Sequence, residues 1–212
     1  DSRRLTPIKC DLLVVGGGAA GTAAATVAAR NGLKVVLVER YGFCGGGAVA
    51  GLSGTICGYY EASDRPSNQP TQAVWGFTDE FVKRLESRGG LSEPIKYGKT
   101  WTRVHDPLMW REISDSLLVE QEVTVIYHSV AIEVFLEGGE RVGGAKVWTK
   151  EGPLEIHASV TVDASGDADL VAMAGFPSTI GDRGRVQNPT MIFRINGGDV
   201  DRFESEYGQD CI

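Results

Sequence analysis

Three glycines and one acidic residue near the N-terminus have the types and the spacing that hold the phosphates and a ribose of a dinucleotide. Gly16, Gly18 and Gly21 follow the apolar run at residues 12–15, and Glu39 ends a second apolar run about 20 residues further on. In such a unit the first glycine permits a tight turn, the second lets a pyrophosphate approach the backbone, and the third lets a helix pack closely on the sheet. A strand, a turn, a helix and a second strand must therefore position these residues.

The helix expected after this turn would supply the phosphate contacts. Ala19 and Ala20 stand in its first turn, where unpaired N–H groups and the positive end of the helix dipole attract anions, and Asn31 and Gly32 end it. Glu39, at the tip of the second strand, can accept hydrogen bonds from a ribose diol, and its charge would repel a 2′-phosphate. The pattern predicts a nucleotide site that disfavours NADP.

A second small-residue turn lies nearer the other end of the chain. The β-branched run 160–163 leads into the turn 164–167, and an alanine-rich helix is expected at 170–174. Together with the first unit, this turn resembles the FAD-dependent oxidoreductases of the glutathione-reductase-like superfamily, especially the bacterial group with an Ala-Ser/Thr-Gly-Asp turn. The segments 41–46 and 105–107 extend the resemblance over most of the chain, whereas an ordinary NAD-binding domain would carry the first motif alone.

The resemblance implies FAD as the cofactor. The first unit would bind the ADP half, the second turn would close over the same half, and the residue that follows the strand expected at 123–127 would touch the adenine through its backbone. The implied cofactor contacts are Gly16, Gly18, Ala19, Ala20, Gly21, Glu39, Arg40, Cys44, Gly45, Gly46, Val130, Ala164, Ser165, Gly166 and Asp167. Cys44 occupies the place of the first cysteine of the redox pair in flavin disulfide reductases. Because residues 48–50 are Ala-Val-Ala, the second cysteine is missing at the usual spacing, and disulfide reductase activity is not expected.

Composition excludes several classes of protein. A net charge of −7 over 212 residues disfavours nucleic-acid binding, which needs a basic surface to neutralise phosphates. The stretch 12–29 approaches the length of a membrane span, but its three consecutive glycines and many alanines fit the turn and helix better. The four cysteines are too scattered for a metal site and too few for a disulfide framework, which favours a reduced, cytoplasmic setting.

The expected fold is a doubly wound, Rossmann-like parallel α/β sheet with an inserted antiparallel β-meander and part of a substrate domain. The domain divisions are 1–60 for the first part of the FAD-binding domain, 61–105 for a substrate-side insertion, 106–176 for its second part with the meander, and 177–212 for the incomplete start of the substrate domain. Periodicity predicts helices over about 72–88 and from Asp106-Pro107 onward, an irregular loop at 52–70, and strands at 123–127, 131–137, 142–150, 154–158 and 190–195.

The function predicted from these motifs is an FAD-dependent oxidoreductase whose flavin accepts a hydride from a small organic substrate. The sequence identifies no catalytic residue: His105, before a helix cap, is interpreted as a capping or packing residue, and His128 borders the expected adenine pocket. Members of the resembled family are usually longer and carry a later glycine-aspartate segment that contacts the flavin, so a second polypeptide or a further C-terminal portion is expected. Two alternatives remain: a nucleotide-binding chain without activity of its own, and a thiazole-synthase-like protein that uses a nicotinamide nucleotide. The Ala-Ser-Gly-Asp turn disfavours the second.

Overall fold

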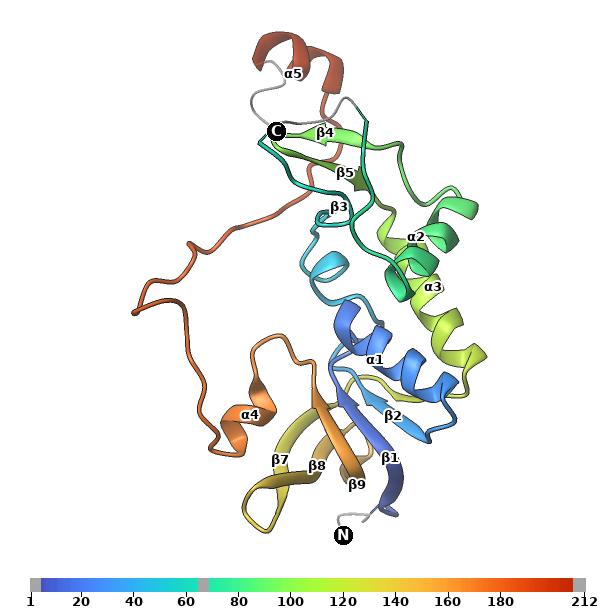
Figure 1. Ribbon diagram of the computed structural model, residues 1–212, viewed down its shortest axis with the longest axis vertical. Helices are drawn as coiled ribbons and strands as arrows, with labels where there is room; N and C mark the ends of the chain where they lie inside the picture. The colour runs from blue at the N-terminus through green and yellow to red at the C-terminus, as the bar shows by residue number, and fades with distance from the viewer. Residues whose placement is uncertain (1–4, 65–68, 208–212) are drawn as a thin grey trace.

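A six-stranded sheet is the larger of the two sheets in the computed structural model, which describes residues 5–64 and 69–207, and it lies in the lower part of the view in Figure 1. Its strands, in spatial order, are β6 (Thr124–Ile126), β2 (Val35–Val38), β1 (Ile8–Val15), β9 (Gly152–Asp163), β8 (Arg141–Thr149) and β7 (Val130–Glu137). The first four run parallel, and β8 and β7 continue the sheet antiparallel. Val15 pairs with both Val38 and Asp163, so β1, β2 and β9 end at one level. This common edge is where open α/β sheets bind ligands.

Helices cover one face of the parallel strands. Residues Leu12, Val14 and Leu37 of the sheet pack with Ala25 of α1 (Ala19–Arg30) and Leu118 of α3 (Pro107–Glu120). The predicted start of α3 is confirmed, because the Asp106 side chain accepts from the backbone N–H groups of the second and third helical residues, with Pro107 in the first position. A further helix, α2 (Phe77–Ser87), lies against α1 and α3. It begins later than the predicted residue 72, directly after Gly76, which has a φ of +74°.

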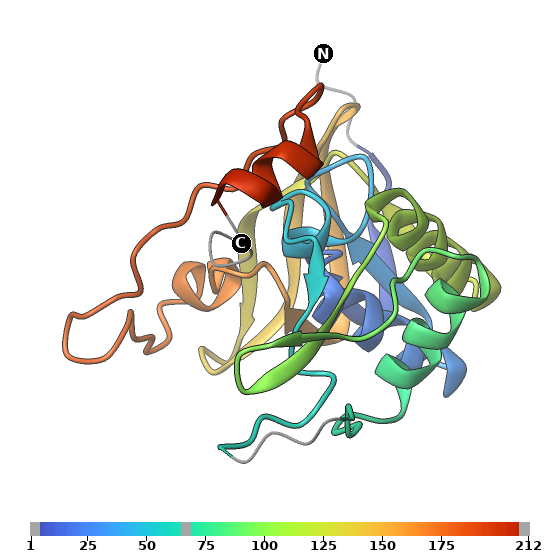
Figure 2. The ribbon, with the colours of Figure 1, turned by 90° about the horizontal axis from the view of Figure 1, so that it is seen from above.

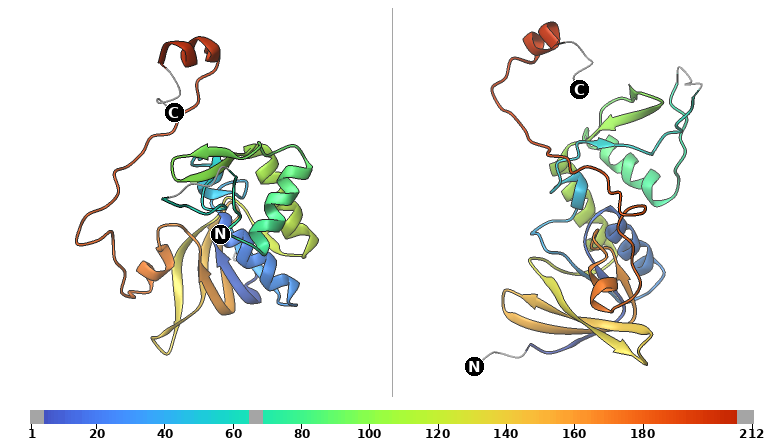
Figure 3. Two further views of the ribbon diagram at one scale, coloured as in Figure 1. Left: turned by 45° about the horizontal axis from the view of Figure 1, so that its top comes forward. Right: turned by 90° about the vertical axis from the view of Figure 1, so that its left-hand side faces the viewer.

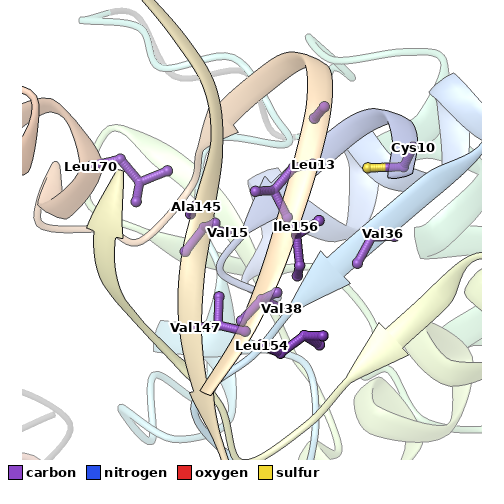
Figure 4. Packing of buried hydrophobic residues seen from close by; sticks show 11 residues of the cluster. Cys10, Leu13, Val15, Val36, Val38, Ala145, Val147, Leu154, Ile156 and Leu170 are labelled. Atoms are coloured by element: carbon purple, nitrogen blue, oxygen red, sulfur yellow. The ribbon is translucent and has the colours of Figure 1, made fainter. Parts of the chain in front are cut away.

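The meander covers the opposite face of the sheet. Leu13 and Val15 of β1 pack with Ala145 and Val147 of β8 and with Ile156 of β9 (Figure 4). The strands predicted separately at 154–158 and 160–163 are one long strand, because β9 pairs with β8 through residues 152–157 and with β1 through residues 156–163. The meander is therefore an extension of the parallel sheet that folds back over its face.

A small antiparallel sheet lies beyond the carboxyl ends of β1 and β2 (Figure 1). Its order is β3 (Thr55–Ile56), β5 (Thr100–Val104) and β4 (Ile95–Tyr97). The sequence did not predict these strands, since segment 52–70 was expected to be irregular. They are short: Ile56 of β3 and Trp101 of β5 pack in two small clusters with α2 and α3, whereas β4 is exposed. Figure 2 shows this layer from above.

The segment after the parallel sheet carries two short helices, α4 (Asp169–Met173) and α5 (Val200–Tyr207), and the stretch between them runs away from the body of the protein (Figure 3). The strand predicted at 190–195 is wrong: those residues have no regular structure, and Met191 and Phe193 are 86% and 69% exposed. A strand needs a neighbour for its backbone N–H and C=O groups, and no described strand lies beside this stretch. Among the described residues, no helix has the length and apolarity required to cross a membrane.

Candidate cofactor site

A cavity of about 360 Å³ opens at the carboxyl ends of β1, β2 and β9. It lies where the glycine turn after β1, the segment after β2 and the turn after β9 converge. Its lining residues are Val15, Gly16, Gly18, Ala19, Ala20, Val38, Glu39, Arg40, Tyr41, Gly46, Gly47, Ser129, Val130, Ala131, Ala164, Ser165, Gly166 and Asp169.

Two of the three motif glycines are required by the fold itself. Gly16 has a φ of +104°, and a Cβ on it would lie 2.2 Å from the carbonyl oxygen of Ala164. A Cβ on Gly21 would lie 1.8 Å from the carbonyl oxygen of Gly16. Both contacts are far shorter than any real Cβ makes, so a side chain at either position would separate the turn from β9 or the helix from the turn. These glycines bring the two predicted turns together.

Gly18 differs from its neighbours because the fold does not require a glycine there. Its φ of −68° and ψ of −174° are extended backbone open to any residue, and the nearest atom to a Cβ would be the Gly46 Cα, 3.8 Å away. Gly18 is also the N-cap of α1, where no side chain caps the helix and no acidic residue occupies the first turn. Free N–H groups, the positive helix end and open space above a bare backbone suit a phosphate group.

Glu39 lies at the same edge and is only 4% exposed. Its Oε2 accepts a hydrogen bond from the backbone N–H of Gly17 at 2.6 Å, and its Oε1 accepts from that of Tyr41 at 2.7 Å. The carboxylate thus fixes the glycine turn to the end of β2, while its remaining lone pairs border the cavity. Sequence reasoning predicted the ribose contact but missed this structural role.

Asp163 organises the second turn. Its Oδ1 accepts from the backbone N–H and the hydroxyl of Ser165, at 3.1 and 2.6 Å, and its Oδ2 accepts from the backbone N–H groups of Leu170 and Val171. Burial alone would raise the pKa of Asp163, but these four hydrogen bonds outweigh it and lower the pKa below its ordinary value. The turn and the start of α4 therefore share one carboxylate.

Replacing Asp163 should lower the stability of the fold by an amount that depends on pH. Because its folded pKa is lowered, its stabilisation is complete above the ordinary aspartate pKa of about 3.9 and is lost as pH falls through the folded value. We expect Asp163→Asn to unfold at lower urea concentration than the wild type at neutral pH, with a difference that shrinks below about pH 4. Urea titrations at several pH values measure this, and a difference that does not change with pH would contradict it.

The remaining wall of the cavity comes from the segment after β6. The backbone N–H of Ser129 donates to the Glu39 carbonyl at 3.0 Å, and that of His128 donates to the Tyr41 carbonyl at 3.0 Å. These bonds place Val130, 44% exposed, on the cavity wall. His128 itself does not line the cavity, so the structure gives it no contact with a ligand there.

Most of the residues predicted from the sequence line this cavity, but four do not. Gly21 packs against the Gly16 carbonyl, and the Gly45 N–H donates to the Gly17 carbonyl, so both contact the turn without lining the cavity. Asp167 does not line the cavity either, whereas Asp169 does. Cys44 is fully buried beneath Gly17, with its Sγ 3.6 Å from the Tyr127 hydroxyl. Burial raises the pKa of the Cys44 thiol to about 11, so it is protonated and shielded rather than a reactive thiolate or a flavin attachment point.

Several lining residues were missed by sequence reasoning: Val15, Val38, Tyr41, Gly47, Ser129, Ala131 and Asp169. Val15 and Val38 are strand ends next to motif residues, and strand position could have found them. Ser129 and Ala131 are brought in by the pairing of β6 with β2, which the local sequence does not specify. Among the described residues, no group of three or more His, Cys, Asp or Glu side chains could hold a metal ion.

The fold and the position of the cavity define an α/β domain of the dinucleotide-binding type, with the cavity at the carboxyl ends of the parallel strands. Residues 11–212 match the model of the FAD dependent oxidoreductase family, and the chain belongs to that family. FAD is therefore the cofactor that the site implies, and the free helix end and the bare Gly18 backbone fit it.

Solved structures share the fold. One is a geranylgeranyl bacteriochlorophyll reductase-like protein from Thermoplasma acidophilum (22% identity, 84% of this chain, 45% of that chain, TM-score 0.60). A second is THI4 from Thermovibrio ammonificans (22% identity, 80% of this chain, 64% of that chain, TM-score 0.53). A third is L-proline dehydrogenase from P. horikoshii (16% identity, 83% of this chain, 58% of that chain, TM-score 0.56). The chain spans between 45% and 64% of the length of these structures. No curated protein matches the sequence.

Proposed function

We propose that this chain binds FAD through its ADP half and belongs to an oxidoreductase whose flavin accepts a hydride from a small organic substrate. The observation that carries the proposal is Gly18: neither backbone conformation nor packing requires a glycine there, yet it faces the cavity at an uncapped helix end. A ligand that approaches the backbone closely explains the residue, and a pyrophosphate is the group that this arrangement suits.

The chain's own residues have separate tasks in this proposal. The N–H groups at the start of α1 bind the pyrophosphate, Glu39 accepts from a ribose hydroxyl, and the 164–166 turn closes the cavity from β9. When bound, FAD supplies the redox chemistry, and the protein contributes binding, orientation and exclusion of water. The same combination of turn, acid and second turn supports our further assignment of the chain to the glutathione-reductase-like superfamily of flavoproteins.

The contacts to the flavin ring and the substrate belong, in our proposal, to additional polypeptide, either a second chain or a continuation of this one. Two observations support this. The cavity is built around the glycine turn and Glu39, the elements suited to the ADP half of a dinucleotide. In addition, Met191, Ile192 and Phe193 are exposed without a covering layer, and exposed apolar surface of this kind marks interfaces. We also propose a reducing, cytoplasmic compartment, because Cys10, Cys44 and Cys57 are all free thiols.

Identifying the nucleotide released from the purified protein tests the proposal. We expect denaturation to release intact FAD, detected by chromatography of the supernatant together with flavin absorbance before denaturation. FMN or NAD alone would contradict FAD binding, and NAD would favour the alternative enzyme that uses a nicotinamide nucleotide.

The same preparation tests completeness. If residues 1–212 alone form an FAD-loaded monomer that turns over a substrate, the need for additional polypeptide is refuted. A nucleotide-loaded chain that stays inactive with every added chain would instead favour the nucleotide-binding role without catalysis.

A further inference from the structure

The segment 45–54 connects the cofactor cavity to the substrate-side sheet. At its beginning, the backbone N–H of Gly45 donates to the Gly17 carbonyl at 2.8 Å, and a Cβ on Gly46 would lie 2.9 Å from the Gly18 Cα. Gly46 and Gly47 line the cavity, and β3 begins directly after the segment. The start of the segment, Gly46 and Gly47, therefore forms a wall of the cavity next to the glycine turn after β1.

Both ends of this segment meet one pair of side chains at the start of α3. His105 Nε2 lies 2.7 Å from the Ser53 carbonyl oxygen, and the His105 backbone N–H donates to the Gly54 carbonyl at 3.0 Å. The His105 ring packs on Trp110 with centroids 4.7 Å apart, and Trp110 Cδ1 lies 3.3 Å from the position of a Cβ on Gly45. His105 is thus hydrogen-bonded to the C-terminal end of the segment, and Trp110 lies beside Gly45 at its start.

The contact of the His105 ring with Ser53 defines its neutral tautomer. A carbonyl oxygen only accepts, so Nε2 is the donor, and in the neutral ring Nδ1 is then an acceptor without a proton. Nδ1 is buried without a hydrogen-bond partner among the described residues, and the whole side chain is only 4% exposed. An apolar ring would fill the same space without a buried unpaired nitrogen. Local departures of this kind are expected where a residue serves function rather than stability.

We propose that His105 is a positioning residue that holds segment 45–54 in the conformation in which Gly46 and Gly47 close the phosphate side of the cofactor cavity. The inference rests on the proposed FAD binding, and it gives His105 a different role from the capping role expected of its position, since Asp106 is the cap. His105 acts through the Ser53 carbonyl and Trp110, and it makes no contact with the cofactor in this proposal.

Two substitutions at His105 separate its hydrogen bond from its volume. His105→Phe keeps a ring against Trp110 and removes the donor, whereas His105→Gln restores an N–H near the position of Nε2. His157→Phe is the matched control, because His157 also packs on an aromatic ring, Phe135 at 5.0 Å, but on the meander away from the cavity. FAD affinity and backbone amide hydrogen exchange of residues 45–54 are measured on the full chain.

We expect His105→Phe to weaken FAD binding about tenfold and to speed exchange in segment 45–54, with His105→Gln near wild type and His157→Phe unchanged. Wild-type affinity and exchange in His105→Phe would overturn the proposal, as would equal losses in both His105 variants. If the wild type binds no FAD, the proposed function fails, while the exchange data still decide whether His105 holds the segment.

Should His105→Phe fail to fold, the wild-type protein gives the answer by nitrogen NMR of the histidine ring. We expect a protonated Nε2 whose proton exchanges slowly, and more slowly still when FAD is added. A proton on Nδ1 instead, or an Nε2 proton that exchanges freely, would overturn the proposal.

Discussion

Gly18→Val should abolish FAD binding while leaving the fold in place. A Cβ at this position would lie 3.8 Å from the nearest protein atom, and the backbone angles of Gly18 suit any residue. The side chain would instead occupy the space in which the pyrophosphate approaches the helix end. Loss of two charge-assisted hydrogen bonds, at about 1.5–3 kcal/mol each, corresponds to at least about a hundredfold weaker binding.

Substitutions at two other glycines distinguish a specific loss of FAD binding from a loss of the fold. Gly198→Val places a side chain in open space away from the cavity, and it should bind FAD normally. Gly21→Ala drives a Cβ into the Gly16 carbonyl oxygen and should lose the fold together with the cofactor. Far-ultraviolet circular dichroism and flavin titration distinguish the three outcomes. A folded Gly18→Val protein with its full complement of flavin would show that the phosphates lie elsewhere.

The elements that local sequence could predict are those whose cause is local. The turn after β1 needs glycine at Gly16 for its φ of +104° and at Gly21 because a Cβ would meet the Gly16 carbonyl oxygen, and the start of α3 needs only Asp106 and the proline after it. The β3–β5–β4 sheet escaped prediction because its strands are short and its pairings join residues such as Thr55 and Val104, which are far apart in the sequence. The strand expected at 190–195 failed for the opposite reason, since its apolar pattern was present but no described strand pairs with it.

The candidate site shows the same division between local and long-range causes. The glycine turn and Glu39 follow one another along the chain, and the structure places both on the cavity. Cys44 was misplaced because its proximity to the turn in sequence does not reveal that Gly17 covers it. His105 was interpreted from its neighbour Asp106, although its hydrogen bond to Ser53 crosses 52 residues. No pattern of spacing specifies such a contact.

Replacing Glu39 should lower both the affinity for FAD and the stability of the protein. Its buried carboxylate accepts from the N–H groups of Gly17 and Tyr41, so removing it leaves two donors unpaired at about 1–3 kcal/mol each. We therefore expect Glu39→Ala to lower the free energy of unfolding of the cofactor-free protein by about 2–6 kcal/mol. The affinity for FAD should fall at least tenfold. Glu39→Arg should be worse on both measures, since it buries a cation against two donors.

Asp11→Asn is the control for the general effect of a lost carboxylate, because Asp11 accepts from the Lys34 backbone N–H at 2.7 Å on the exposed end of the same strands. It should change FAD affinity little. Urea unfolding without FAD and flavin titration of the refolded protein provide the two measurements. If Glu39→Ala unfolds like the wild type but binds no FAD, Glu39 serves the ribose alone. If it binds FAD normally, the carboxylate does not face the ribose. The combined loss that we expect would show one side chain that shapes the phosphate turn and binds the nucleotide.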